Sequence, residues 1–287
     1  MVSPKTRNLI ELNVAVLLWG GTALFAKLID LPLGHIIFGR SLTAALALGL
    51  FVTGLRMDLR IRGARDTAGL ILIGVLLGVH WLTYFHAIQV STVAVAIIAL
   101  HTYPMVTILL EPWFFGERLH RLDFALGIAV LVGVAILVPE LDPGSATTQG
   151  VLWGVVSAVF FALRNLLTRR YVQRYPSSVL MFYQALVILV CLAPYALFHP
   201  VTTTRGSVAK LVLLGVVFTA LPQTLFTSSH THLKAKTVSI IATLLPVYGP
   251  VSAALFLGEI PSVRTVIGGV VVVVAVAAET FRHVKAE

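Results

Sequence analysis

Long apolar segments alternate with short polar ones from one end of the chain to the other. A helix needs about 20 apolar residues to cross the hydrocarbon core of a bilayer. Ten segments meet this length, approximately Leu9–Ile29, Leu33–Gly54, Thr67–Ile88, Ser91–Leu110, Asp123–Pro139, Gln149–Thr168, Ser178–Phe198, Val208–Ser228, Thr237–Leu257 and Ser262–Phe281. The pattern predicts an all-α integral membrane protein with ten transmembrane helices.

The sequence also repeats itself at an offset of 142 residues. The stretches Pro104–Glu117 and Pro246–Glu259 each begin with proline and end thirteen residues later in Gly-Glu. The same offset carries Trp19 onto Phe161. A register held along the chain indicates a duplication of five spans. Because five is odd, the two copies must cross the membrane in opposite directions, which is typical of carriers that rock about a central site.

The duplication predicts two domains. Residues 1–139 form the first five-helix repeat, residues 140–149 form an external linker, and residues 150–287 form the second, inverted repeat. Pro104 and Pro246 fall inside corresponding spans of the two repeats. A proline within a span frees a backbone carbonyl, which is tolerated only against protein or water. Matched interrupted helices therefore point to a central cavity between the repeats.

The two Gly-Glu pairs have a structural interpretation. Gly116 and Gly258 can each end a helix in a left-handed cap. We expect Glu117 and Glu259 to lie near the positive end of the helix that follows each of them.

Composition excludes a soluble domain. The chain is 58% hydrophobic and only 11% charged, with a mean hydropathy of +0.95, whereas soluble domains have about 25% charged residues. An excess of basic residues can indicate nucleic-acid binding, but here the basic residues sit in short loops between apolar runs, so we expect the lipid bilayer and no nucleic acid as a partner. The single Cys191 excludes a disulfide framework.

The distribution of charge predicts the orientation. With the N-terminus taken as cytoplasmic, fifteen basic residues lie near the inner ends of the spans and four near the outer ends. Such an asymmetry across short loops fits ten spans with both termini inside. The apolar run after Lys5 and Arg7 has no clear cleavage site and carries repeated residues, so we interpret it as an uncleaved first span.

Polar residues at mid-span are the best indication of function, because lipid disfavours them. None of the twelve acidic residues falls there, which argues against a proton pump that uses a buried carboxylate and against catalysis by paired acids. His80 and Tyr84 share a helical face, beside Trp81, and His101 lies three residues before Pro104.

These observations define a candidate substrate-binding set. Trp19 and its repeat mate Phe161 lie near mid-span, and Tyr103 is included although its spacing from His101 suggests a different face. Gln184 is either a gate contact or part of a packing pair, and Arg40 makes a structural contact or binds an anion. The set is His80, Tyr84, His101, Trp19, Phe161, Trp81, Tyr103 and Gln184. We expect no catalytic residue, no metal and no cofactor.

The chain resembles the drug/metabolite transporter superfamily, specifically its ten-span EamA-type exporters. The likeness is carried by Trp19-Gly20-Gly21-Thr22 with Lys27, Arg40 eight residues after Pro32, both elements that run from proline to Gly-Glu, and Gly127 with Gly269. The resemblance implies two inverted five-helix repeats in a bacterial inner membrane, a central cavity and export of small metabolites. It is nearest to exporters of amino acids, including aromatic ones, and leaves a homodimer open.

The leading functional prediction is export of amino acids or similar small metabolites by alternating access, as uniport or exchange. Efflux of cationic drugs is the alternative; it can use the same aromatic residues but calls for a counter-charge that the sequence does not provide. An integral-membrane enzyme is disfavoured because no His-Glu-x-x-His element or Ser-His-Asp set occurs at one depth. A pore is disfavoured only weakly, by the inverted repeats.

Overall fold

The computed structural model describes residues 4–115, 121–137, 142–229, 242 and 244–285. These residues are largely helical, and no strand occurs among them. The helices are α1 (Pro4–Thr22), α2 (Phe25–Leu28), α3 (Leu33–Gly54), α4 (Ala64–Val90), α5 (Val93–Leu100), α6 (Tyr103–Phe115), α7 (Arg121–Leu137), α8 (Ala146–Tyr171), α9 (Ser177–Phe198), α10 (Arg205–Gly215), α11 (Leu221–Ser229), α13 (Leu245–Leu257) and α14 (Val263–Lys285), with a π-helical turn η1 (Val216–Ala220).

Seven helical segments of the described residues are long and apolar enough to cross a bilayer. They are Thr6–Leu28, Leu33–Gly54, Ala64–Val90, Val93–Phe115, Ala146–Tyr171, Ser177–Phe198 and Arg205–Phe226, and each coincides with a span predicted from the sequence. Shorter apolar helices, Ala125–Leu137, Leu245–Leu257 and Val263–Ala275, lie within the other predicted segments. The described part is thus helical and multi-pass, and the number of ten spans stays a prediction.

Both prolines of the sequence repeat lie at the start of a helix. The fourth predicted span is divided into α5 and α6, and Pro104 is the second residue of α6. Pro246 is likewise the second residue of α13. Proline is tolerated in a first turn because the N–H that it lacks has no intrahelical acceptor there. The break in the fourth span consequently falls at His101 and Thr102, just before the proline.

Pro222 shows how a freed carbonyl inside a span is satisfied. It follows the π-helical turn η1 and offers no N–H to the carbonyl of Phe218, four residues earlier. Thr22 of α1 donates its hydroxyl to this carbonyl, with an Oγ1–O distance of 3.0 Å. A π-helical turn inserts an extra residue into a helix and is frequent at functional sites. Nothing in the hydrophobic pattern predicts it.

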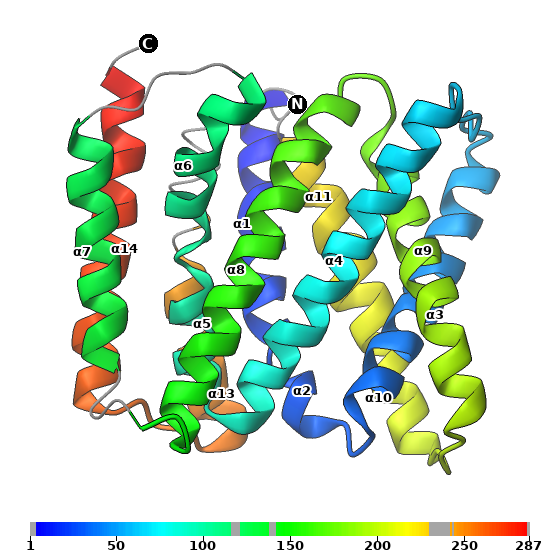
Figure 1. The fold of residues 1–287 in the computed structure, drawn as a ribbon. Coiled ribbons are helices and arrows are strands. Elements are labelled where there is room, and N and C mark those ends of the chain that lie inside the picture. Colours follow the sequence, from blue (N-terminus) through cyan, green and yellow to red (C-terminus); the bar gives the residue numbers. More distant parts are fainter. Residues whose placement is uncertain (1–3, 116–120, 138–141, 230–241, 243, 286–287) are drawn as a thin grey trace.

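The helices stand side by side, with the start of α1 and the end of α14 at the same end of the molecule (Figure 1). In that view α7 packs against α14 at one side, α3 against α9 at the other, and α4 against α8 between them. One large cluster of buried apolar side chains includes Ile37 and Leu77 from the first half of the chain and Phe161 and Met181 from the second. The two halves therefore share one core.

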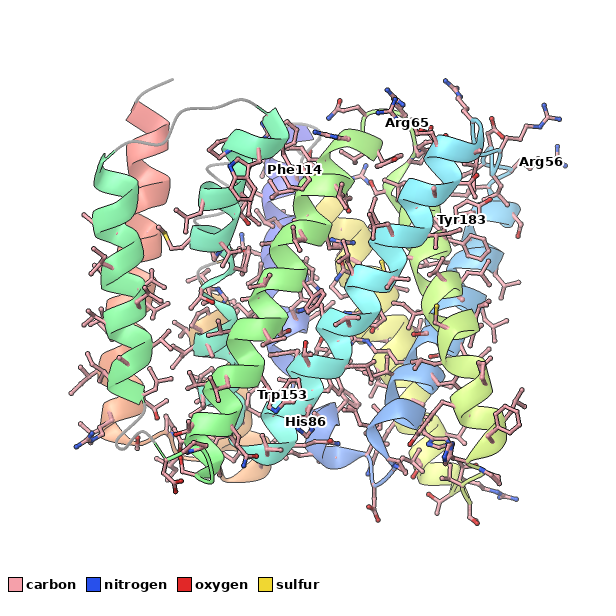
Figure 2. The ribbon with its side chains drawn as sticks, viewed as in Figure 1. Arg56, Arg65, His86, Phe114, Trp153 and Tyr183 are labelled. Carbon is pink, nitrogen blue, oxygen red and sulfur yellow. The ribbon has the colours of Figure 1, made fainter. Side chains whose placement is uncertain are left out.

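The two ends of the molecule differ in character. Arg56 and Arg65 lie at the end where α1 begins, whereas His86 and Trp153 lie at the opposite end (Figure 2). The rings of His86 and Trp153 meet edge to face with their centroids 5.0 Å apart, which joins α4 to α8 there. The end that carries Arg56 and Arg65 is the one for which the sequence predicts a cytoplasmic location.

Candidate functional site

A cavity of about 60 Å³ lies inside the helix bundle. Its walls come from α1, α3, α4, α5, α6, α8, α11 and α13, together with the break between α5 and α6 and with Ala242. The lining residues are Trp19, Thr22, Arg40, His80, Trp81, Tyr84, Leu100, His101, Tyr103, Phe161, Gln223, Ala242 and Leu245. A water molecule needs roughly 10–15 Å³ on this measure, so the cavity in this conformation suits only a few waters.

Seven of the eight predicted residues line this one cavity: Trp19, His80, Trp81, Tyr84, His101, Tyr103 and Phe161. The expectation that Tyr103 faces away from His101 is wrong, because their rings meet with centroids 5.8 Å apart. A spacing of two residues separates side chains onto different faces only in a continuous helix. Here the helix is broken at His101, and the break lets both rings turn to the same space.

Gln184 is the predicted residue that the structure does not bring to the cavity. It is buried on α9, where its side-chain oxygen accepts a hydrogen bond from Nε of Arg164 at 2.8 Å. Its amide nitrogen donates to the carbonyl of Leu180 at 3.0 Å. Arg164 also donates to Asn165 at 3.1 Å. These bonds satisfy buried polar groups. They agree with the second interpretation of Gln184, as part of a packing pair.

Phe161 is the centre of the aromatic wall. Its ring stacks on His80 with centroids 4.5 Å apart and meets Tyr103 edge to face at 4.9 Å. On α4 the rings of His80 and Tyr84 are nearly parallel, 6.0 Å apart, as their four-residue spacing predicts. Trp19, which also lines the cavity, packs against Phe226 with the ring centroids 4.6 Å apart. The wall offers flat apolar faces that can bind an apolar group or a cation.

His80 is held by Ser157 of α8. Its Nδ1 lies 2.7 Å from the hydroxyl and 3.2 Å from the backbone carbonyl of Ser157. The Ser157 hydroxyl donates in turn to the carbonyl of His80 at 3.0 Å. A carbonyl only accepts, so both contacts assign the proton to Nδ1. In the neutral ring this tautomer leaves Nε2 as a hydrogen-bond acceptor for a group in the cavity.

His101 caps α5 at the break, and both of its ring nitrogens face carbonyls. Nδ1 lies 3.2 Å from the carbonyl of Ile97, and Nε2 lies 3.4 Å from that of Ala242. A neutral imidazole can donate to only one of the two. The shorter contact belongs to its own helix, so the nitrogen near Ala242 has the weaker attachment. A substrate can therefore compete for it at low cost.

Arg40 of α3 is a functional candidate that the sequence left undecided. Its side chain is buried, with a relative exposure of 2%. Nε donates to the hydroxyl of Thr219 at 2.7 Å, and the guanidinium carbon lies 3.9 Å from the ring centroid of Trp81. No hydrogen-bond acceptor in the described residues reaches Nη1. Of the two structural interpretations of Arg40, a salt bridge or a contact at a helix end, no salt bridge occurs among the described residues.

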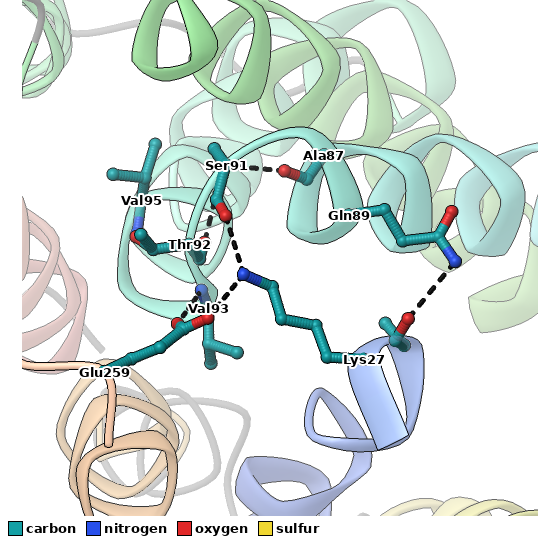
Figure 3. Close-up of polar contacts among 9 residues, drawn as sticks. Lys27, Ala87, Gln89, Ser91, Thr92, Val93, Val95 and Glu259 are labelled. Atoms are coloured by element: carbon teal, nitrogen blue, oxygen red, sulfur yellow. Dashed lines mark hydrogen bonds and ion pairs between the residues drawn. The ribbon is translucent and has the colours of Figure 1, made fainter. Parts of the chain in front are cut away.

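An ion pair joins α2 to the residues after α13 (Figure 3), at the end of the molecule opposite to the start of α1 (Figure 1). Lys27 of α2 pairs with Glu259, which follows α13. Lys27 also donates to the carbonyl of Ser91 at 2.8 Å, and Glu259 accepts from the backbone N–H of Val93 at 2.9 Å. We refer to Lys27, Glu259, Ser91 and Val93 as the latch. It connects the first half of the chain with the second.

The Gly-Glu element that can be compared with the structure is Gly258 and Glu259, at the end of α13. Gly258 ends α13 in the left-handed conformation, with φ of 69°, as expected. The proximity of Glu259 to the positive end of α14 stays a prediction. In the structure the carboxylate of Glu259 caps the N-terminus of another helix, α5, by accepting from the N–H of Val93. Gly116 and Glu117 lie outside the described residues.

No metal centre is found in the part of the chain that the structure describes. There, no group of three or more His, Cys, Asp or Glu side chains is placed to hold a metal ion. The cavity lining contains imidazole, phenol, guanidinium and amide groups but no carboxylate. A multi-pass helical bundle around a polar and aromatic cavity is the architecture of many membrane transporters.

Comparison with known proteins gives the family. The EamA-like transporter family matches residues 9–138 and 148–279, and the chain belongs to this family. The uncharacterized transporter YxxF of Bacillus subtilis (strain 168) is 25% identical over 97% of this chain and 91% of its own length. The pseudopaline exporter CntI of Pseudomonas aeruginosa (strain UCBPP-PA14) is 29% identical over 85% of each chain.

Two further similarities extend this picture. The S-adenosylmethionine uptake transporter of Rickettsia bellii (strain RML369-C) is 24% identical over 71% of this chain and 69% of its own length. A solved crystal structure superposes with a TM-score of 0.71 at 19% identity, and covers 99% of this chain and 100% of its own. That likeness shows the fold. The names of the relatives indicate a transporter rather than an enzyme.

Proposed function

We propose that the protein exports amino acids or similar small metabolites by alternating access. The observation that carries the proposal is the cavity lined by Phe161, where an aromatic wall faces hydrogen-bonding groups on His80, Tyr84, His101 and Tyr103. The wall suits the apolar part of a metabolite, and the polar groups suit its head. The relatives named for small organic substrates include both an exporter and an uptake transporter, and the cavity supports the same class of substrate.

The mechanism that we propose uses two inverted five-helix repeats, residues 1–139 and 150–287, joined by an external linker at 140–149. Support comes from the family match to two segments, 9–138 and 148–279, whose boundaries fall close to these. Pro104 and Pro246 support it as well, since each is the second residue of a helix beside the cavity. Carriers built in this way bind substrate where interrupted helices of the two halves meet.

The size of the cavity indicates that its walls must move. A volume of about 60 Å³ has no room for an amino acid, whereas pockets for small ligands are commonly several hundred Å³. The latch joins the two halves of the chain at one end. We infer that release of the latch and separation of the repeats widen the cavity and admit substrate from one side at a time.

We propose that both termini are cytoplasmic in a bacterial inner membrane, with the latch at the outer face. The start of α1 and the end of α14 lie at one end, beside Arg56 and Arg65 (Figures 1 and 2). A membrane-impermeant thiol reagent should reach a cysteine at Ser145 from outside and one at Ser3 only after lysis. Labelling of both from the same side would contradict the inverted arrangement.

Counterflow in proteoliposomes tests the proposed function. Vesicles that contain the full chain are preloaded with unlabelled L-phenylalanine or L-leucine and exposed to the labelled compound. We expect saturable, transient accumulation that depends on the preloaded amino acid, because exchange through an alternating site requires a substrate on both sides. Accumulation of ethidium instead would favour drug efflux. Leakage that does not saturate would indicate a pore.

A further inference from the structure

The guanidinium of Arg40 lies in the cavity wall and has no role in the proposed function as stated above. Charged side chains within a membrane-spanning helix normally face a partner or a wet cavity. Arg40 is 2% exposed and lines the cavity, yet no carboxylate pairs with it among the described residues. Its only described hydrogen bond is the one that Nε donates to Thr219.

The contacts of Arg40 fix the orientation of its planar group. Thr219, in the π-helical turn η1, holds the Nε edge at 2.7 Å, and Trp81 covers one face with its ring centroid 3.9 Å from the guanidinium carbon. Phe85 lies at 5.2 Å from the same carbon. These neighbours occupy one edge and one face of the guanidinium. They do not hydrogen-bond to its two terminal nitrogens, of which Nη1 has no partner among the described residues. That pair matches the two oxygens of a carboxylate.

The energetics favour an anion at this position. A buried charge is costly unless it is paired, and the face of Trp81 compensates only part of the lost hydration of the guanidinium. The residues that line the cavity include no aspartate or glutamate to supply the missing negative charge. A substrate that brings a carboxylate completes the pairing, whereas a substrate with positive charge alone meets repulsion.

We propose that Arg40 binds the carboxylate of the transported substrate and thereby makes the cavity selective for compounds that carry an acidic group. The inference rests on the proposed function in assuming that this cavity is the transport site. Thr219 is a positioning residue that aims the guanidinium, and Trp81 excludes water from one of its faces. The aromatic wall around Phe161 and the acceptor nitrogen of His80 then bind the other parts of the substrate, including an ammonium group.

Two matched sets of three compounds test the proposal in the purified full chain. The first set is L-phenylalanine, L-phenylalaninamide and 3-phenylpropanoate, and the second is L-leucine, L-leucinamide and 4-methylpentanoate. Each amide keeps the side chain and the ammonium group but lacks the carboxylate, and each acid lacks the ammonium group. Trp19 and Trp81 line the cavity, so that their fluorescence reports occupancy. We expect each amide to bind about 10- to 100-fold more weakly than its amino acid, the scale of a hydrogen bond to a charged group.

Variants of Arg40 should remove this discrimination. In Arg40→Gln we expect the amino acid to bind as weakly as the amide. In Arg40→Lys part of the difference in affinity between amino acid and amide should remain, because the positive charge is kept but the paired donors of the guanidinium are lost. Arg164→Gln is the matched control, since Arg164 is also buried, at 5% exposure, but its guanidinium is bound to Gln184 and Asn165 away from the cavity. This control should discriminate as the wild type does.

The possible outcomes separate this inference from the proposed function. If only 3-phenylpropanoate and 4-methylpentanoate bind, and Arg40→Gln abolishes their binding, amino-acid export is wrong and the role of Arg40 stands. Amides that bind the wild type as tightly as the amino acids overturn the role of Arg40, even if Arg40→Gln does not fold. The role of Arg40 is equally overturned if no carboxylate binds, or if tetraphenylphosphonium is the only compound bound.

Discussion

A covalent link between positions 27 and 259 should reduce transport to the level of empty vesicles. In the structure Lys27 and Glu259 pair directly, and together with Ser91 and Val93 they join α2, the start of α5 and the end of α13 (Figure 3). Alternating access requires this end to open in each cycle. A bond that does not break holds the carrier in one conformation, and a single trapped conformation cannot complete exchange.

The measurement uses Lys27→Cys and Glu259→Cys in a Cys191→Ser background, cross-linked by a short bifunctional methanethiosulfonate. Counterflow should be lost after cross-linking and restored by a reductant. The matched control is a pair of cysteines at Arg7 and Glu11, which form an ion pair of 2.8 Å within α1 itself. A cross-link there joins two points of one helix and should leave transport intact. Undiminished exchange by protein fully cross-linked at 27 and 259 would exclude an opening of this end.

The positions of the helices could be predicted because the bilayer imposes a length on apolar segments. Each of the seven membrane-long segments in the structure lies at a predicted span, and the shorter apolar helices lie at the others. The convergence of His80 and Tyr84 followed from their four-residue spacing on one helix. These features depend on local sequence alone, so periodicity and length were sufficient to find them.

Features that depend on distant parts of the chain were not predictable in the same way. Thr219, the partner of Arg40, is 179 residues away and lies in a π-helical turn that has no signature in the hydrophobic pattern. Glu259 caps a helix that begins 166 residues earlier in the chain. Only tertiary structure decides which of several acceptors a long polar side chain reaches. The sequence therefore offers alternatives for Arg40 and does not predict the contact between Glu259 and Val93.

The prediction for Tyr103 was wrong for a related reason. It treated the fourth span as one helix, whereas the chain breaks at His101 and Thr102. Pro104 marked the break, but a proline alone does not tell how the residues before it turn. The break brings His101 and Tyr103 to the same cavity. A kinked span can thus present neighbouring residues that a regular helix would separate.

Replacement of His101 or Tyr84 by alanine should weaken substrate binding much more than it weakens the fold. Both side chains line the cavity. When one of them is removed, the polar group of the bound substrate that it contacted is buried without a hydrogen-bond partner. The expected loss of affinity is about 1–3 kcal/mol, or roughly 5- to 150-fold. Thermal stability should change less, because a side chain on a cavity wall has packing partners on only part of its surface.

His35→Ala is the matched control for His101→Ala. His35 is also buried, on α3, and lies beside the ring of Tyr195 rather than at the cavity. Neither of its ring nitrogens has a hydrogen-bond partner among the described residues, so its removal breaks no polar contact there. Tyr84→Phe removes the hydroxyl but keeps the ring, and it should retain the aromatic contact with His80. Affinity is measured by Trp fluorescence and stability by thermal unfolding of the same samples. If His101→Ala and Tyr84→Ala lower the melting temperature while the folded protein binds substrate as before, these residues stabilise the bundle and the cavity is not where substrate binds.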